Sequence, residues 1–214
     1  MDLSNYGIDK NNKLLEIALT HSSYANEHKL QSYERLEFLG DAVLELIISE
    51  YLFKEMHLKE GEMTKIRSRY VCEEALDEYA KSINLKDYIK VSSSFDEPNA
   101  SVIADVFEAV IAVIYLSKGF SPARKFVMDI AKPYIDKNVI FLSDYKSYLQ
   151  ELVQTEQKTV EYKVVKTTGP AHDRTFEVEA IIDNIVYAKG FGKSKKAAEQ
   201  DAAKKTIKLS AGVK

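Results

Sequence analysis

ERLEFLGD, at residues 34–41, is the stretch that decides the fold of the first part of the chain. Glu34, Glu37 and Asp41 are three and then four residues apart, so on a helix they share one face. Most of the neighbouring residues are apolar, which predicts a helix over about 32–56 that packs into a core.

Gly40 helps to distinguish two interpretations of this acidic face. A solvated stripe of carboxylates is common on helices and needs no special role. Glycine inside a helix, however, costs about 1 kcal/mol relative to alanine. Its presence indicates that another backbone or a ligand approaches the helix closely at this point.

A second acidic pair lies in the very apolar stretch VIADVFEAVIAVIYL, residues 102–116. This stretch predicts a helix that is apolar on nearly every side and therefore buried. Its only charges are Asp105 and Glu108, one turn apart on the same face. Buried carboxylates are costly unless they meet a cation or become protonated, and the helix itself holds no Lys or Arg to neutralise them.

If the two acidic faces converge, Glu37, Asp41, Asp105 and Glu108 form a cluster of oxygen ligands. Such ligands suit Mg²⁺, which Mn²⁺ can replace, and do not suit zinc, which prefers His and Cys. The four histidines show no metal-ligand spacing. A metal held by carboxylates can activate water and stabilise charge during hydrolysis of a phosphodiester.

Charge divides the chain into two unlike parts, although the formal net charge is only −3. Residues 144–214 carry 13 Lys or Arg against 10 Asp or Glu, whereas residues 1–143 carry 17 against 23. An acidic part joined to a basic part indicates one site rich in carboxylates and one surface that prefers phosphate.

The single cysteine, Cys72, rules out a disulfide within the chain and favours a reducing, cytoplasmic setting. Residues 1–13 are polar and lack the apolar core of a signal peptide. The longest uncharged apolar stretch, 109–116, is far shorter than the roughly 20 residues that span a bilayer. We therefore expect a soluble protein with no membrane partner.

The pattern predicts an all-α first domain over residues 1–142. Thr64 is expected to cap a helix that contains Cys72, and Ser121-Pro122 to begin the last helix. The predicted helices cover 13–20, 32–56, 64–83, 100–117 and a segment from 121 onward.

A small α+β domain of order α-β-β-β-α is predicted over 145–211, after a linker at 138–144. Its first helix is expected to turn Tyr148, Leu149, Leu152 and Val153 inward, and Asp183-Asn184 to form a hairpin turn. The predicted elements cover 144–155, 160–167, 175–182, 185–190 and a helix from 193 onward.

The basic domain offers a candidate phosphate-binding surface. Three lysines are expected to crowd the N-terminus of the last helix, where cations are unfavourable to the helix but a phosphate would meet free N–H groups. Two glutamines, four residues apart, share one face of the first helix and could reach 2′-hydroxyl groups. The candidate contacts are Gln150, Gln154, His172, Lys193, Lys195 and Lys196.

Taken together, these motifs resemble those of bacterial ribonuclease III. ERLEFLGD is similar to the family's signature, and Asp105 to Glu108 to its second acidic motif. The second domain resembles the double-stranded-RNA-binding domain that follows the nuclease domain in bacterial members. The matching stretches in it are LQE at 149–151, GPAH at 169–172 and KSKKAA at 193–198.

The resemblance implies an Mg²⁺-dependent endonuclease that cuts double-stranded RNA and leaves 5′-phosphate and 3′-hydroxyl ends. Processing of ribosomal and other structured precursor RNAs is the implied task. Glu37, Asp41, Asp105 and Glu108 match the family's metal ligands, and Asp41 and Glu108 are the positions singled out as catalytic. Glu34 and Glu60 match supporting acidic positions.

The resemblance also implies a homodimer in which each nuclease domain cuts one strand. Phe38 matches the aromatic residue that the family inserts into its partner subunit, although the sequence alone supports a core position equally well. Residues 91–100 form a shorter segment than in many bacterial members and lack their glycine-rich basic loop. That difference puts some RNA contacts in doubt but removes no metal ligand.

Two alternatives to a nuclease remain at this stage. A protein that binds double-stranded RNA without cutting it would explain the basic domain, but it would have no reason to keep two carboxylates in an apolar helix. A metal-stabilised structural dimer would leave the basic domain unexplained.

Overall fold

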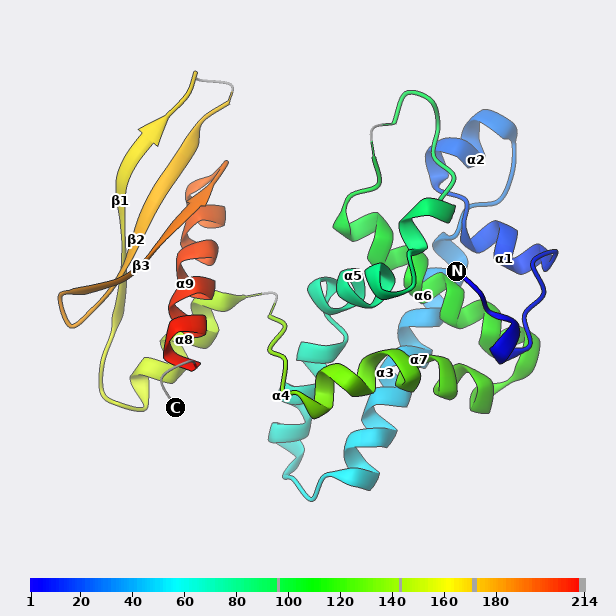
Figure 1. Cartoon of the computed structure of the whole chain (residues 1–214), viewed down its shortest axis with the longest axis horizontal. Helices are drawn as coiled ribbons and strands as arrows, with labels where there is room; N and C mark the ends of the chain where they lie inside the picture. Colours follow the sequence, from blue (N-terminus) through cyan, green and yellow to red (C-terminus); the bar gives the residue numbers. More distant parts are fainter. Residues whose placement is uncertain (96, 143, 171–172, 212–214) are drawn as a thin grey trace. The chain divides into compact units, whose positions relative to one another are not determined.

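The computed structural model describes residues 1–95, 97–142, 144–170 and 173–211. The chain divides into two compact units, Met1–Ser143 and Asp144–Lys214 (Figure 1). The first is helical, and the second contains a three-stranded sheet with two helices. The predicted fold class is confirmed.

The first unit is built from α-helices and short 3₁₀ helices. Its elements are η1 (Ser4–Tyr6), α1 (Lys13–Ala18), α2 (Ser22–His28), α3 (Glu34–Glu55), α4 (Glu60–Tyr70), α5 (Glu73–Ser82), η2 (Leu85–Tyr88), α6 (Ala100–Lys118) and α7 (Phe120–Asp136).

Helix α6 forms the centre of this unit, with α1, α3, α5 and α7 packed around it. Asn99 caps it by accepting a hydrogen bond from the amide of Val102 at 3.0 Å. Within the described residues α6 is the one helix long and apolar enough to cross a membrane, but 61% of that apolar window is buried inside the unit. Its hydrophobicity is therefore accounted for by its place in the core.

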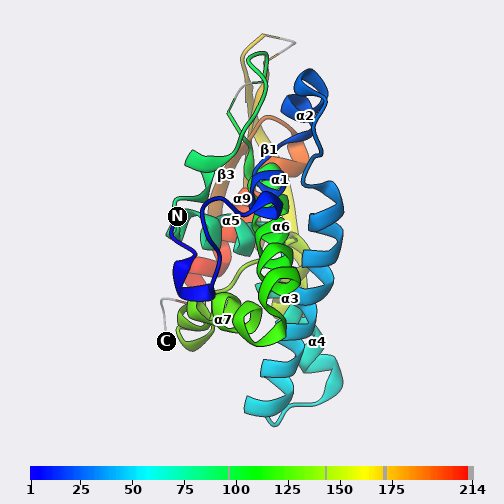
Figure 2. The same ribbon diagram turned by 90° about the vertical axis from the view of Figure 1, so that its right-hand side faces the viewer.

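Helices α3 and α6 lie side by side (Figure 2), and their backbones come close together at Gly40. A Cβ atom on Gly40 would lie 1.9 Å from the backbone oxygen of Glu108, so no larger residue fits without moving a helix. The close backbone approach inferred from this mid-helix glycine is confirmed. It brings the signature stretch directly against the second acidic pair.

The single helix predicted over 64–83 is wrong, because the chain leaves the helical conformation at Val71 and Cys72. Cys72 is the N-cap of α5, and Thr64 lies inside α4, where its hydroxyl donates to Glu60 at 3.1 Å. The break lets Tyr79 fold back so that its hydroxyl donates to the carbonyl of Tyr70 at 3.3 Å, inside the core. An apolar pattern that continued through the break concealed it.

Helix α2 was not predicted, because its seven residues are mostly polar and show no apolar period. It begins after His21, whose ring accepts a hydrogen bond from the amide of Ser23, and it ends at Lys29 in the left-handed conformation. At the other end of the unit, α7 begins at Phe120, after Gly119 as its N-cap. The prediction that Ser121 caps this helix is therefore wrong.

The second unit has the predicted order of a helix, three strands and a helix. The sheet is antiparallel in the order β1-β2-β3, and both helices pack on one face of it (Figure 1). Its elements are α8 (Tyr145–Gln154), β1 (Val160–Thr168), β2 (Thr175–Ile182), β3 (Ile185–Gly192) and α9 (Lys195–Ala211).

The β2–β3 hairpin turns at Asp183 and Asn184, as predicted, and both residues have positive φ, of 50° and 63°. On β3, Gly190 lets α9 pack directly on the sheet, because a Cβ there would lie 2.1 Å from the carbonyl oxygen of Ala198. The C-terminal helix thereby receives a fixed position on the sheet.

The inward face of α8 differs from the prediction. Tyr145, Leu149 and Val153 form its buried stripe, whereas Leu152 is 40% exposed. Asp144 accepts a hydrogen bond from the amide of Ser147 and so places Tyr145 at the first helical position, facing the core. The prediction missed Tyr145 because it ran the helix across the cap.

The segment 138–144, expected to be a linker, is partly packed in the first unit. The ring of Phe141 is buried and contacts the rings of Tyr70, Tyr79 and Tyr134. The amide of Leu142 donates to Glu74 at 3.4 Å. The aromatic cluster thus fixes the chain up to residue 142, while Asp144 already caps α8.

Replacement of Gly40 by alanine should destabilise the first unit, although alanine favours a helix by about 1 kcal/mol. The added methyl group would collide with the α6 backbone, and overpacking of this kind costs about 1–3 kcal/mol or more. Urea unfolding should give a lower midpoint for Gly40→Ala. Gly61→Ala is the matched control, since nothing lies within 4 Å of that position. An equal stability change in both variants would contradict the close contact.

Candidate metal centre and nucleic-acid-binding surface

The α3–α6 contact brings four carboxylates onto one shared face. Glu37 and Asp41 come from α3, and Asp105 and Glu108 from α6. The negative charges of Asp41, Asp105 and Glu37 each raise the pKa of Glu108, which places all four within electrostatic range. The two acidic helix faces therefore lie within electrostatic range of each other in one chain.

Burial and like charge act together on these groups. Burial, followed by repulsion from Asp41 and Asp105, raises the pKa of Glu108 to about 8. Burial is also the largest cause of the raised pKa values of Glu37 and Asp105. Asp41, by contrast, is exposed and gives the group its opening to solvent. In the part of the chain that the structure describes, no Lys or Arg forms an ion pair with any of them.

The donor chemistry fits a hard divalent cation, because all four groups offer carboxylate oxygen. Nevertheless, no three His, Cys, Asp or Glu side chains in the described residues stand at metal-ligating spacing in this conformation. The four carboxylates therefore lie on a shared face, but in this conformation they are not close enough together to ligate one cation. A divalent cation would offset the repulsion that raises their pKa values.

Asp105 has two further neighbours that the sequence interpretation overlooked. The hydroxyl of Tyr33 donates to its Oδ2 at 3.1 Å. That hydrogen bond and the electrostatic influence of the nearby His21 both lower the pKa of Asp105, which partly offsets the larger effect of burial. Tyr33 directly precedes the signature stretch, but its partner is 72 positions away, so only the fold reveals the contact.

Glu34 and Glu60 occupy different places relative to this group. Glu34 is exposed in the first turn of α3, and its charge contributes to the raised pKa of Glu37. Glu60 begins α4, beyond the far end of the 22-residue helix α3. Glu60 lies near Phe53, since both line one hollow, and Phe53 is 16 residues beyond Glu37 on α3, which at about 1.5 Å per residue is roughly 24 Å along the helix. The four carboxylates and Glu60 are not brought together within one chain.

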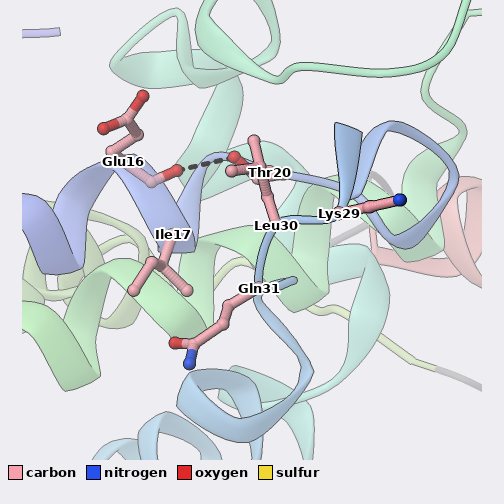
Figure 3. Close-up of a pocket in the computed structure, with 6 residues that line it drawn as sticks. All are labelled: Glu16, Ile17, Thr20, Lys29, Leu30 and Gln31. Atoms are coloured by element: carbon pink, nitrogen blue, oxygen red, sulfur yellow. Dashed lines mark hydrogen bonds between the residues drawn. The ribbon is translucent and has the colours of Figure 1, made fainter. Parts of the chain in front are cut away.

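A hollow of about 390 Å³ lies elsewhere on the first unit (Figure 3). Within it the Thr20 hydroxyl donates to the carbonyl of Glu16 at 2.7 Å. It contains none of the four carboxylates, so the acidic face remains the candidate site. The hollow is lined by Glu16, Ile17, Thr20, Lys29, Leu30 and Gln31.

The basic surface of the second unit is built around the start of α9. Lys195 and Lys196 occupy the first two helical positions and are exposed. Lys193 lies before the helix, not within it as predicted, because Ser194 takes the cap position and accepts a hydrogen bond from the amide of Ala197. The Lys193 ammonium group pairs with Asp173 at 2.6 Å.

The other candidate contacts of this surface lie on α8 and in the β1–β2 loop. Gln150 is half-buried and Gln154 is exposed, one turn apart on α8. In the loop, Gly169 has a φ of 92°, and a Cβ there would lie 2.3 Å from the carbonyl oxygen of Asp173. His172 lies outside the described residues.

Comparison with known proteins gives consistent matches for both units. Residues 11–134 match the family model described as ribonuclease-III-like, and residues 145–209 match the double-stranded RNA binding motif. Ribonuclease 3 of Streptococcus pyogenes serotype M5 (strain Manfredo) is 45% identical over 204 residues, covering 91% of this chain and 89% of the relative. Ribonuclease 3 of Streptococcus uberis is 43% identical over 216 residues, covering 96% and 94%.

Among solved structures, the nuclease domain of ribonuclease III from Campylobacter jejuni is similar to the first unit. One such structure has a TM-score of 0.56 and 36% identity, covering 61% of this chain and 93% of the other. A second has a TM-score of 0.55 at the same identity.

The raised pKa of Glu108 predicts that the metal-free protein loses stability as pH rises between about 5 and 8. In that window the folded state holds a proton that the unfolded state, with an ordinary Glu pKa of 4.5, has released. Each pH unit should therefore lower the free energy of unfolding by up to about 1.4 kcal/mol through this group. Urea unfolding in EDTA should show a shallower pH slope for Glu108→Gln. Parallel slopes for the two proteins would refute the shift.

Proposed function

The chain belongs to the ribonuclease III family of double-strand-specific endoribonucleases, and from that premise we propose that Glu37, Asp41, Asp105 and Glu108 form its metal-dependent active site. The observation that carries this proposal is the convergence of two acidic helix faces at Gly40, with burial and mutual repulsion raising the pKa of Glu108 to about 8. Such a perturbed acidic group is typical of a functional site.

Mg²⁺ is the proposed cofactor, with Mn²⁺ able to replace it, since all the donors are carboxylate oxygens. When bound, the cation lowers the pKa of a ligated water and stabilises negative charge on the phosphate and the leaving oxygen. Glu37, Asp41, Asp105 and Glu108 would hold the cation. Asp41 and Glu108 are the proposed catalytic residues, with Asp41 on the open side, where a phosphate can enter.

The proposed reaction is hydrolysis of phosphodiester bonds that leaves 5′-phosphate and 3′-hydroxyl ends. The proposed substrates are ribosomal and other structured precursor RNAs in the cytoplasm. We assign catalysis to residues 1–142 and RNA binding to residues 145–211, joined by 138–144. Glu34 is proposed to support the site through its charge on Glu37.

Double-stranded RNA is proposed to lie across α8 and the start of α9. Lys195 and Lys196 are exposed at the positive end of the α9 dipole, where phosphate is favoured. Gln150 and Gln154 offer amides to 2′-hydroxyl groups, and His172 and Lys193 complete the proposed contacts. Since the deep groove of A-form RNA hides base edges, this surface should recognise shape more than sequence.

A homodimer is proposed from the outer face of α3. Phe38, Leu46 and Phe53 are 82%, 56% and 74% exposed on it. Leu46 lies eight residues after Phe38 and seven before Phe53, so the three repeat almost symmetrically along the helix. In an antiparallel pairing about a two-fold axis, Leu46 meets its counterpart and Phe38 meets the end that carries Phe53.

A hollow of about 340 Å³ stands at that end of α3 and is the proposed acceptor for the partner's Phe38. The same pairing brings Glu60 of one subunit toward the Glu37 end of the other, which gives Glu60 a role that one chain cannot provide. The hollow is lined by Ser49, Leu52, Phe53, Glu60, Met63, Thr64 and Arg67.

Glu108→Gln should abolish most cleavage while leaving RNA binding intact. Loss of one electrostatic contributor to a phosphoryl site lowers the rate on the order of 100-fold or more. A labelled RNA duplex should be cut by the wild type with Mg²⁺ and not with EDTA, whereas the variant should bind the duplex with unchanged affinity.

The complementary control is Lys195→Ala with Lys196→Ala, which should weaken duplex binding and flatten its salt dependence but leave cation binding unchanged. Wild-type protein that binds the duplex without cutting it in Mg²⁺ or Mn²⁺ would show that the acidic face is not a nuclease site.

Phe38→Ala should weaken the dimer at least about tenfold, because exposed aromatic anchors commonly contribute 2 kcal/mol or more to an interface. Since Phe38 is 82% exposed in the single chain, its removal should leave the stability of the first unit unchanged. Sedimentation across a dilution series measures the proportions of monomer and dimer and hence the dissociation constant of the dimer. Tyr88→Ala, an exposed aromatic on η2, is the control. Equal dissociation of the two variants would show that Phe38 does not anchor the dimer.

A further inference from the structure

Tyr33 combines burial with direct contact to a proposed metal ligand. Its side chain is only 5% exposed, and its hydroxyl donates to Oδ2 of Asp105 at 3.1 Å. A buried hydroxyl needs such a partner, and a hydrogen bond to a charged acceptor is stronger than one between neutral groups. The contact therefore fixes the orientation of the carboxylate as well as satisfying the tyrosine.

The backbone of Tyr33 is held as firmly as its side chain. Its amide donates to the carbonyl of Thr20 at 3.1 Å. Its carbonyl accepts from the amides of Leu36 at 2.8 Å and Glu37 at 2.9 Å, closing the first turn of α3. One residue thus sets the backbone of Glu37 on α3 and the side chain of Asp105 on α6.

The wall behind the Tyr33 ring is also fixed. His21 contacts this ring at a centroid distance of 5.9 Å and the Phe95 ring at 4.5 Å. The amide of Ser23 donates to Nδ1 of His21 at 3.2 Å, and the Ser23 hydroxyl accepts from the amide of Ser92 at 3.1 Å. The tyrosine has little room to swing away from Asp105.

We propose that Tyr33 is a positioning residue of the metal centre, whose hydroxyl holds Oδ2 of Asp105 and so keeps this carboxylate turned toward the shared face. This inference rests on the proposed function, since it requires Asp105 to be a metal ligand. Free rotation of Asp105 would let its carboxylate turn away from the shared face. Loss of hydrogen-bonding partners of metal ligands typically lowers metal affinity or activity about 10–100-fold.

The test compares cation binding by Tyr33→Phe and wild type in the full-length protein. Manganese binding, followed by electron paramagnetic resonance without RNA, should be at least about tenfold weaker in the variant. Half-maximal cleavage should need correspondingly more Mg²⁺, and excess cation should restore the rate, with the KM for duplex RNA unchanged.

The chain offers a matched control in Tyr6→Phe. The Tyr6 hydroxyl donates to Asp129 at 2.9 Å, so this variant removes the same kind of bond from the same unit, but the acceptor is on α7. It should lower thermal stability in EDTA to a similar degree and leave manganese affinity unchanged. Weakening of manganese binding by both variants alike would overturn the positioning role, because it would show a general loss of stability.

Asp105→Asn separates the inference from the proposed function. If this variant loses manganese affinity while Tyr33→Phe binds as the wild type does, the positioning role is overturned and the metal centre stands. If Asp105→Asn itself binds manganese as the wild type does, the proposed centre fails and the inference fails with it.

Discussion

The close approach of α3 and α6 at Gly40 is the constraint on which the rest of the first unit depends. With hydrogen in place of a side chain, the α3 backbone lies against the carbonyl of Glu108, at a point where a Cβ would come within 1.9 Å. The apolar residues on both helices supply the burial that holds this contact. Its consequence is electrostatic, because the same contact turns two acidic faces toward each other.

That arrangement costs stability, because burial and like charge disfavour the ionised carboxylates. A core optimised for stability alone would not keep Asp105 and Glu108 on an otherwise apolar helix, nor set Glu37 opposite them. The raised pKa values of Glu37, Asp105 and Glu108 reflect this unfavourable burial of like charges. The first unit tolerates it because the apolar residues of α6 are almost all buried and supply the compensating free energy.

What could be predicted from the sequence follows from how local each feature is. Asp105 and Glu108 stand out because their neighbours are apolar, and Gly40 because glycine is unfavourable in a helix, so the four carboxylates could be proposed from local pattern alone. The break at Cys72 was not predicted, since the contact that it allows, from the Tyr79 hydroxyl to the carbonyl of Tyr70, exists only in the folded chain. The role of Tyr33 could not be predicted for the same reason, because its hydrogen-bond acceptor, Asp105, is 72 positions away in the sequence.

Helix α3 has a distinct role on each of its sides. Its inner side packs on α6 and carries Glu37 at its first turn, while its outer side leaves Phe38, Leu46 and Phe53 exposed. Large exposed aromatic residues are costly in water, and their near-symmetrical spacing suits a second copy of the same helix better than an unrelated partner. In the proposed dimer, the length of α3 then has a function. Within one chain, the length of α3 keeps Glu60 far from the four carboxylates. In an antiparallel pairing of two α3 helices, Glu60 of one subunit would instead come close to the carboxylates of the other.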